Sequence, residues 1–303
     1  MANGTIAKKL PSADQILEPS PFQLMMRRVL GHAGMTFGGG VLILIFAAAL
    51  FAPILSPHDP YTQDLTKRFL DPVWGATGSW EHPLGTDKFG RDYLSRMMFG
   101  ARTSLLIGFS AMLISGILGT ALGVAAGYFG GRVDIVITFI ITTRLAMPVI
   151  LVALVVVALI GSSLTIVIWV LGLLIWDRFA VVMRAATQQA RNMDYVAAAK
   201  ALGCSTFRIV LTEIMPNVAN ALIVVASLEV AHAIFLEASL SFLGLGVQPP
   251  TPSWGLMVSE GKGMMFFKAW VIAIPGTALF MLMLCINLLG DGIRDVTAPE
   301  NRN

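Results

Sequence analysis

Long apolar runs are the feature that most constrains what this chain can fold into. A helix needs about 20 residues to cross the hydrocarbon of a bilayer, because lipid offers no hydrogen-bond partners to the backbone. Six runs reach or approach that length, with glycine, proline or charged residues close to their ends: 35–56, 105–129, 133–160, 164–182, 218–240 and 270–289. These runs predict an all-α polytopic membrane protein with six transmembrane helices.

The overall composition agrees with this prediction. Hydrophobic residues make up 56% of the 303 residues, charged residues only 13%, and the mean hydropathy is +0.75, which excludes an ordinary soluble domain. The net charge of +3 comes from short basic clusters between the apolar runs. These clusters indicate orientation in membrane lipid, and no nucleic-acid partner is predicted. The two cysteines, Cys204 and Cys285, predict no disulfide framework.

The distribution of Lys and Arg predicts the side that each polar segment faces. Six spans put both termini on one side, and the more basic side is the cytoplasm. We therefore expect a multi-pass protein with both termini in the cytoplasm. Its expected segments are a cytoplasmic N-terminal segment 1–34, a first transmembrane helix 35–56, a periplasmic loop 57–102, a five-helix core 103–292 that includes a cytoplasmic loop 184–216, and a cytoplasmic tail 293–303.

The cytoplasmic loop 184–216 is hydrophilic, and its residues favour two short helices. Asp194 can cap the first helix, Gly203 can end it in a left-handed conformation, and Ser205 can cap the second. Pro216 then marks the start of the fifth span. The small side chains before Gly203 leave a smooth surface that another protein can approach closely. From these residues alone, a docking surface and a solvated connector are equal alternatives.

The same loop resembles the EAA loop of ABC-importer permeases, which docks into the ATPase subunit. Ala198, Ala199, Gly203 and Pro216 match that pattern, whereas Ala197 stands where the family has glutamate. The resemblance implies that the ATPase-coupling residues are Tyr195, Ala197, Ala198, Ala199, Lys200, Leu202, Gly203, Ser205 and Pro216.

Three further strings resemble the C-type permease subunit of the dipeptide and oligopeptide (and nickel) ABC-importer family. They are HPLGTD at 82–87 with GRD at 90–92, the segment 239–255, and NLLGDGIRD at 287–295. The likeness implies the type I ABC-importer permease architecture in the bacterial inner membrane, where the chain would form half of a translocation pathway for peptides or similar small solutes. It leaves the substrate open among dipeptides, oligopeptides, glutathione, opines and nickel.

The resemblance also implies a set of partners. These are a B-type permease subunit that completes a heterodimer, two cytoplasmic ABC ATPase subunits, and a periplasmic or lipid-anchored solute-binding protein. ATP and Mg would bind to the ATPase subunits. The sequence contains no G-x-x-x-x-G-K-[ST] phosphate loop, so we expect this chain to bind no cofactor and to be no enzyme.

Ionisable residues lie inside the predicted spans. Arg144 and Glu229 share a depth of about 16 Å, at 1.5 Å of rise per residue from the starts of the third and fifth spans. His232 follows Glu229 on the same helix face. Because such residues usually face the bundle interior and pair, we expect either a structural Arg144–Glu229 ion pair or a pathway site. Glu237, at the outer end of the fifth span, is expected to cap the following loop or to face the pathway.

Two other classes of protein remain as alternatives. An ion-driven secondary transporter would need charged pathway residues without a docking loop. An intramembrane protease would need two membrane-embedded aspartates or a serine and histidine pair, and no aspartate lies in the middle of a predicted span. His58 and His82 lie in the polar periplasmic loop, where we expect a structural role and no metal site.

Overall fold

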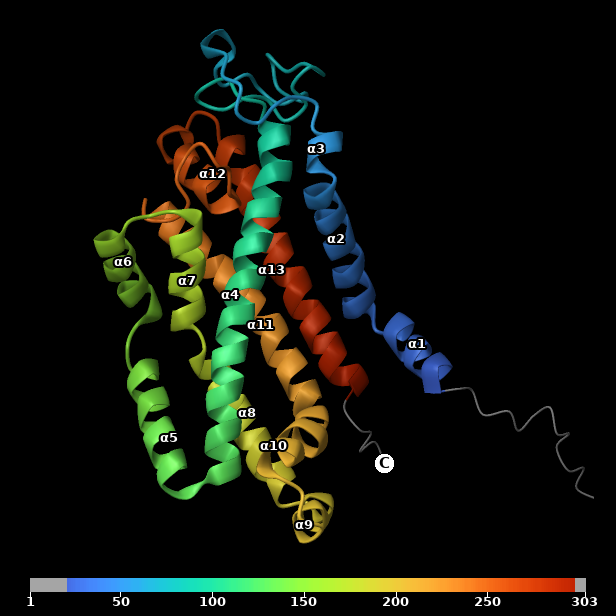
Figure 1. Ribbon diagram of the computed structural model, residues 1–303. Coiled ribbons are helices and arrows are strands. Elements are labelled where there is room, and N and C mark those ends of the chain that lie inside the picture. Colours follow the sequence, from blue (N-terminus) through green and yellow to red (C-terminus); the bar gives the residue numbers. More distant parts are fainter. Residues whose placement is uncertain (1–20, 298–303) are drawn as a thin grey trace, which may run out of the picture.

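The chain folds into a bundle of helices that run between two opposite ends of the molecule (Figure 1). The computed structural model describes residues 21–297, and within that range the β pairing consists of one isolated bridge, between Thr86 and Asp92. The α-helices are α1 (Pro21–Gly31), α2 (Ala33–Leu50), α3 (Ala52–Leu55), α4 (Tyr93–Phe129), α5 (Gly131–Leu145), α6 (Val149–Ile160), α7 (Leu164–Leu174), α8 (Asp177–Arg191), α9 (Asp194–Ala201), α10 (Thr206–Arg208), α11 (Met215–Phe242), α12 (Trp254–Gly261) and α13 (Trp270–Thr297), with 3₁₀ turns at Leu65–Lys67 and Lys262–Met264 and a π-helical segment at Ile209–Ile214.

The structure supports the predicted number of spans. Five helical segments are long and apolar enough to cross a membrane. The number rises to six if the bent pair α5 and α6 counts as one further span. The third span nevertheless differs from the prediction, because α5 and α6 meet at 82° and do not form one helix over 133–160. Pro148 directly precedes α6. Proline has no N–H to donate and its ring obstructs the preceding turn, so the helix breaks there.

The second and fifth spans begin earlier than predicted. α4 starts at Tyr93, inside the expected periplasmic loop 57–102, because the Asp92 carboxylate accepts a hydrogen bond from the Ser95 N–H at 2.7 Å and caps the helix. α10, the π-helical segment and α11 together form one continuous span, Thr206–Phe242. The second short helix of the cytoplasmic loop is therefore the first turn of the fifth span.

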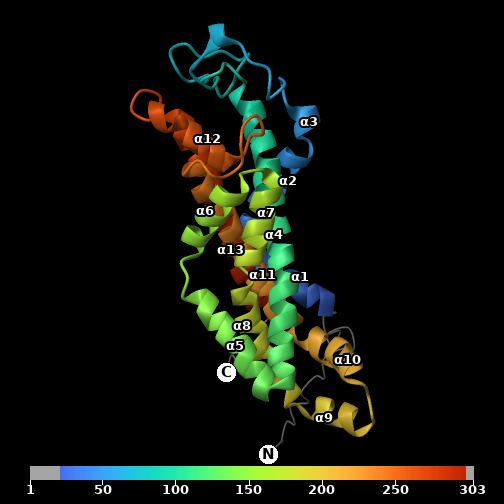
Figure 2. The same cartoon turned by 60° about the vertical axis from the view of Figure 1, so that its left-hand side comes forward.

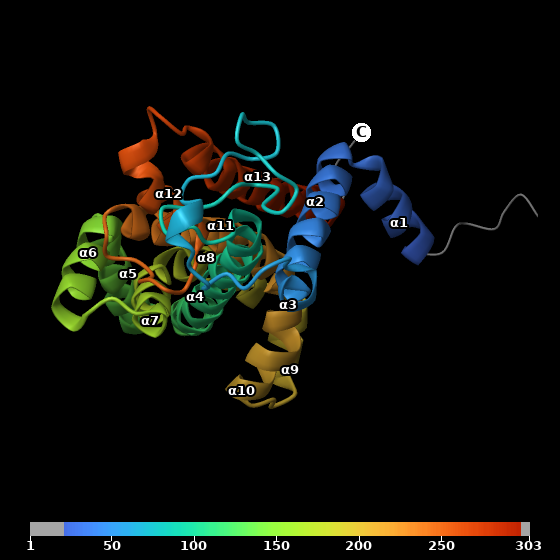
Figure 3. The same cartoon turned by 90° about the horizontal axis from the view of Figure 1, so that it is seen from above.

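The two terminal segments are only partly described. α1 covers part of the expected N-terminal segment 1–34, and residues 1–20 lie outside the described range. Figure 3 shows α1 and α2 at one edge of the molecule, on the opposite side from α5 and α6. α13 continues to Thr297, so the expected polar tail 293–303 begins as helix. Its last residues, 298–303, also lie outside the described range.

Close contact between α4 and α8 depends on glycine. A Cβ atom added at Gly123 would lie 2.5 Å from the Ala180 carbonyl oxygen, and one added at Gly127 would lie 2.7 Å from the Arg184 carbonyl oxygen. Small residues let two membrane helices approach until their backbones touch, which gives van der Waals contact where lipid removes any hydrophobic drive to associate. α8 is thereby fixed against the central helix.

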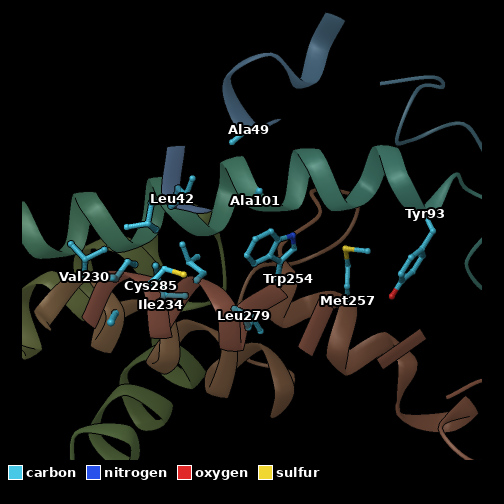
Figure 4. Packing of buried hydrophobic residues seen from close by; sticks show 14 of the residues in the cluster. Leu42, Ala49, Tyr93, Ala101, Val230, Ile234, Trp254, Met257, Leu279 and Cys285 are labelled. Carbon is cyan, nitrogen blue, oxygen red and sulfur yellow. The ribbon is translucent and has the colours of Figure 1, made fainter. Parts of the chain in front are cut away.

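The other sides of α4 pack against α2, α11 and α12. Figure 4 shows Trp254 of α12 beneath Ala101 of α4, and the indole N–H of Trp254 donates to the Met97 carbonyl at 2.8 Å. α2 packs closely on α13, where a Cβ atom added at Gly38 would lie 2.8 Å from the Cys285 carbonyl oxygen. These contacts join the N-terminal helix to the rest of the bundle.

A buried ionic network holds the outer loop, residues 56–92, against α12. Arg96 Nη2 lies 2.7 Å from Glu260 Oε2, and Arg91 Nη2 lies 3.3 Å from Glu260 Oε1. Arg91 Nε also lies 2.6 Å from Asp87 Oδ2. All four side chains are at most 9% exposed. The network therefore fixes the start of α4 relative to α12.

Candidate functional site

The segment after α8 projects from the end of the bundle that lies opposite the outer loop (Figure 1, Figure 2). It consists of α9, the turn 202–205, α10 and the π-helical segment. The end of α13 and helix α1 lie toward this same end of the molecule (Figure 1). The segment corresponds to the later part of the predicted cytoplasmic loop 184–216, because residues 184–191 belong to α8 and continue the fourth span, Leu164–Arg191.

Gly203 ends α9 in the conformation that the sequence predicts. Its φ is +77°, in the left-handed region that favours glycine. The Gly203 N–H donates to the Lys200 carbonyl at 3.0 Å, and the Cys204 N–H donates to the Ala199 carbonyl at 3.1 Å. These two bonds form a Schellman motif, which satisfies carbonyls at the end of the helix. The direction of the chain after α9 is therefore fixed by this turn.

One of the two predicted helix caps, Ser205, is present, and the other, Asp194, is not. The Ser205 hydroxyl accepts a hydrogen bond from the Arg208 N–H at 3.4 Å and caps α10. Asp194 does not cap α9: Met193 holds the extended cap position, and Asp194 is the first helical residue. A carboxylate there still lies near the positive end of the helix dipole. Pro216 lies in the first turn of α11, directly after the π-helical segment Ile209–Ile214.

One face of the projecting segment packs on the bundle and the other is open. Val196, Ala199 and Ile209 are buried in a common apolar cluster. Ala199 therefore does not belong to the smooth outer surface that the three consecutive alanines suggest. Leu202 is 84% exposed and Phe207 is 74% exposed. The other predicted coupling residues on the open side are Tyr195, Ala197, Ala198, Lys200, Gly203, Ser205 and Pro216.

Phe207 was not predicted as a site residue. Its signal in the sequence is an aromatic side chain two positions after the Ser205 cap, within the stretch 203–208 that is otherwise polar or small. Phe207 and Leu202 are the two most exposed large apolar side chains of the projecting segment, and we call this pair its apolar tip. Large apolar side chains so fully exposed at an end of the molecule are typical of a protein contact.

Two arginines of α8, the helix that leads into the projecting segment, bind α8 to α4 and α5. Arg191 Nη1 donates to the Tyr128 carbonyl at 2.8 Å, at the end of α4. Arg184 forms a two-pronged ion pair with Asp134 of α5, at 2.5 and 2.8 Å. Such paired bonds fix orientation as well as distance. α8, which leads into the projecting segment, is thereby bound to both α4 and α5.

A cluster of ionisable groups lies in the membrane part of the bundle, at the opposite end of α8. Glu229 of α11 is wholly buried. Its Oε1 lies 3.2 Å from Arg178 Nη1, and its Oε2 lies 3.1 Å from His232 Nδ1. Arg178 is 54% exposed, so one face of the cluster is open. His232 joins Glu229 as predicted.

Arg144 is not the partner of Glu229, so the predicted ion pair is replaced by one with Arg178. Arg144 instead donates to the carbonyl of Met147, in the break between α5 and α6, and to the carbonyl of Leu174, at the end of α7. The prediction assumed a continuous third helix. Carbonyls at a helix break and at a helix end lack partners within the helix, and the Arg144 guanidinium satisfies one of each kind.

Arg144 and the Glu229 cluster nevertheless border one cavity. It has a volume of about 240 Å³ and lies at the break between α5 and α6. Arg144, Asp177, Arg178 and His232 contribute its polar groups. Two guanidinium groups, an imidazole and a carboxylate around one cavity can bind a small solute that has both charges.

Glu237 belongs to a different part of the molecule. It is wholly buried, and its Oε1 accepts hydrogen bonds from the hydroxyls of Ser241 at 2.7 Å and Ser253 at 2.9 Å. Ser253 caps α12. Of the two roles expected for Glu237, these contacts match the first, in which it holds the loop after α11.

The sequence was compared with families of known proteins. Residues 119–303 match the family described as binding-protein-dependent transport system inner membrane component. Residues 20–72 match the N-terminal transmembrane domain of oligopeptide transport permease C.

Individual relatives match over nearly the full length. The di/tripeptide transport system permease protein DppC of Pseudomonas aeruginosa is 37% identical over 97% of both chains. The dipeptide transport system permease protein DppC of Haemophilus influenzae is 38% identical over 86% of this chain and 89% of that protein. Among solved structures, an inward-facing form of the MetNI methionine ABC transporter matches 67% of this chain and 97% of its own, with a TM-score of 0.56 at 16% identity. That similarity concerns the fold.

Proposed function

The chain belongs to the binding-protein-dependent transport system inner membrane components, and we propose that it forms half of the translocation pathway of an ABC importer for short peptides. A related permease subunit supplies the other half. The family consists of transport subunits, and the phosphate loop that ATP chemistry requires is missing from this sequence. ATP and Mg therefore act on separate ATPase subunits.

The exposed apolar tip on the projecting segment is the observation that best supports this proposal. Leu202 lies in the turn that follows α9, and Phe207 lies in α10. The Gly203 turn fixes the direction of the chain between them. A rigid, solvent-exposed apolar tip is suited to insertion into a pocket of another protein. We assign this tip to the contact with the ATPase subunits.

α8 supplies a mechanical connection from that contact to the membrane. Its 15 residues span about 22 Å at 1.5 Å per residue. Arg191 near its cytoplasmic end is bound to α4, and Arg178 at its other end is bound to Glu229. When the ATPase subunits move the tip, α8 would shift Arg178 relative to α11. The cavity at the broken third span would then change shape.

The cavity chemistry supports a short peptide as the substrate. A free peptide has a carboxylate at one end and an ammonium at the other. Arg144 and Arg178 offer donors for the carboxylate, and Asp177 offers an acceptor for the ammonium. The relatives named for dipeptide and di/tripeptide transport agree with a substrate of this size. A periplasmic or lipid-anchored solute-binding protein would deliver it to the outer end.

The proposed orientation puts the projecting segment, and with it both termini, in the cytoplasm. The outer loop and α12 then face the periplasm of a bacterial inner membrane. Ser79, which is exposed in the outer loop, is a suitable position for a cysteine. A membrane-impermeant thiol reagent should label a Ser79→Cys variant in intact cells but should reach Cys204 only after lysis. Labelling in the reverse order would contradict this orientation.

The ATPase contact can be tested by purifying the full-length chain from its host membranes with its bound subunits. The double variant Leu202→Asp/Phe207→Asp should lose the ATPase subunits, because apolar anchors at a contact typically account for about 2 kcal/mol or more each. Leu65→Asp is the matched control, since Leu65 is 64% exposed in the outer loop. It should retain the subunits. Equal retention in the double variant would refute the assignment.

A further inference from the structure

Two histidines and an aspartate meet in the outer loop, at the end of the molecule away from the ATPase contact. His58 follows α3, His82 lies late in the loop, and Asp92 caps α4. His82 Nδ1 lies 2.9 Å from Asp92 Oδ1, and His58 Nδ1 lies 3.8 Å from the same oxygen. The possible ligand atoms of the three residues all lie within 4.8 Å of one another.

These distances suit a bound transition metal. Zn²⁺ binds imidazole nitrogen and carboxylate oxygen at about 2.0–2.2 Å, so two ligand atoms in a tetrahedral site lie roughly 3.4 Å apart. The three side chains could adopt that geometry with small movements. Two imidazoles with one carboxylate favour Zn²⁺ and similar cations over Ca²⁺ or Mg²⁺, which prefer oxygen ligands.

The surrounding residues hold the three side chains in place. Asp92 Oδ2 accepts hydrogen bonds from the Ser95 N–H at 2.7 Å and the Ser95 hydroxyl at 2.6 Å, which leaves Oδ1 facing the histidines. The Ser95 hydroxyl oxygen also accepts a hydrogen bond from the backbone N–H of His58 at 3.2 Å. Outer contacts of this kind orient the ligands of a metal site. His58 Nδ1 is buried and has no hydrogen-bond partner among the described residues, so a ligand atom is available.

The electrostatic setting also favours a cation. The three residues line a cavity of about 250 Å³ that Asp59, Asp64 and Glu81 also line. Lys67 is the one basic side chain in that lining apart from the histidines, and its Nζ lies 2.6 Å from Glu81 Oε1. The other three carboxylates of the lining, those of Asp59, Asp64 and Asp92, form no ion pair with a lysine or arginine in it.

We propose that His58, His82 and Asp92 form a binding site for a divalent transition cation of the Zn²⁺ class, with a fourth position open to the cavity. The bound cation would join the segment after α3 to the start of α4 and so fasten the outer loop. The site would face the periplasm in the proposed orientation. It does not involve the ATPase contact or the membrane cavity, and its test needs no transport measurement.

The test uses the full-length chain purified with a histidine-free affinity tag, treated with a chelator and titrated with Zn²⁺ by calorimetry. Wild type should bind one Zn²⁺ per chain, and binding should raise its thermal unfolding temperature. His58→Phe keeps an aromatic ring beside His82, whose ring centroid is 4.6 Å away, but removes a ligand. It should weaken binding at least about tenfold, as loss of a metal contact generally does, and should abolish the thermal shift.

Two further variants keep the result interpretable. Asp92→Asn retains a capping oxygen for α4 and should also weaken binding, so a folding defect of His58→Phe would not hide the outcome. His32→Phe is the control: it removes the histidine that caps α2, far from the outer loop in sequence. This variant should bind Zn²⁺ as wild type does. The proposal is overturned if wild type shows no saturable binding. It is also overturned if His58→Phe and Asp92→Asn bind as tightly as wild type, which would leave a hydrogen-bonded pair with a structural role.

Discussion

Replacing Glu260 by glutamine should strongly destabilise the outer end of the bundle. Glu260 is 9% exposed and is the hydrogen-bond partner of both Arg96 and Arg91. Two nitrogens of the wholly buried Arg96 guanidinium, Nε and Nη1, already have no hydrogen-bond partner among the described residues. Glutamine keeps the size of the side chain but removes its charge. The two guanidinium groups would then share only Asp87 as a counter-ion.

The expected loss follows from general experience with buried ion pairs. Removing one partner of such a pair costs about 3–5 kcal/mol, because the other charge is left desolvated without compensation. A loss of about 3 kcal/mol would raise the unfolded fraction roughly 150-fold, at about 1.4 kcal/mol per factor of ten. Reversible unfolding of the purified chain by SDS titration in detergent micelles measures this difference.

Lys88→Met is the matched control. Lys88 is 37% exposed and lies 3.7 Å from the same carboxylate, so its loss should cost at most about 1 kcal/mol, as for other surface ion pairs. Both variants remove ion pairs of the Glu260 carboxylate. Glu260→Gln removes its buried pairs with Arg91 and Arg96, whereas Lys88→Met removes a pair whose lysine is exposed. If Glu260→Gln were no less stable than Lys88→Met, the importance assigned to the buried network would be refuted.

Two other predictions concern helix packing and pH. Gly123→Leu should separate α4 from α8 and cost about 1–3 kcal/mol, whereas Gly40→Leu, with nothing within 4 Å, should be neutral in the same SDS titration. The hydrogen bond from Lys268 holds the pKa of the Asp71 carboxyl below its usual range. A depressed pKa gives stability that is present above the unfolded pKa of about 4 and is lost as pH falls through the folded value. Lys268→Met should therefore reduce the loss of stability between about pH 5 and pH 3, and an unchanged pH profile would contradict the pairing.

Features that depend on neighbouring residues were predictable from the sequence. The turn at Gly203 and the cap at Ser205 need only a few consecutive residues, and both were found. The apolar runs likewise predicted the spans, because membrane insertion depends on local composition. The EAA-like string located the projecting segment for the same reason.

Features that depend on the path of the chain were not predictable. The depth estimate for Arg144 assumed a straight helix, but that helix breaks before Pro148, and the partner of Glu229 is Arg178 of α8. Proline was visible in the sequence, but proline kinks some membrane helices without breaking them. His58 lies 34 residues before Asp92, with an irregular loop between them. No periodic pattern relates two such positions, so their proximity could only be found in the structure.

Uptake of a labelled dipeptide by whole cells tests the central claim most directly. A host strain that lacks the gene for this chain should regain ATP-dependent uptake with the wild-type gene. It should fail to regain uptake with Leu202→Asp/Phe207→Asp, although that variant reaches the membrane at the wild-type level. Leu65→Asp should restore uptake. Full uptake with the double variant, or no dependence of uptake on the wild-type gene, would contradict a peptide permease that is driven through the exposed tip formed by Leu202 and Phe207.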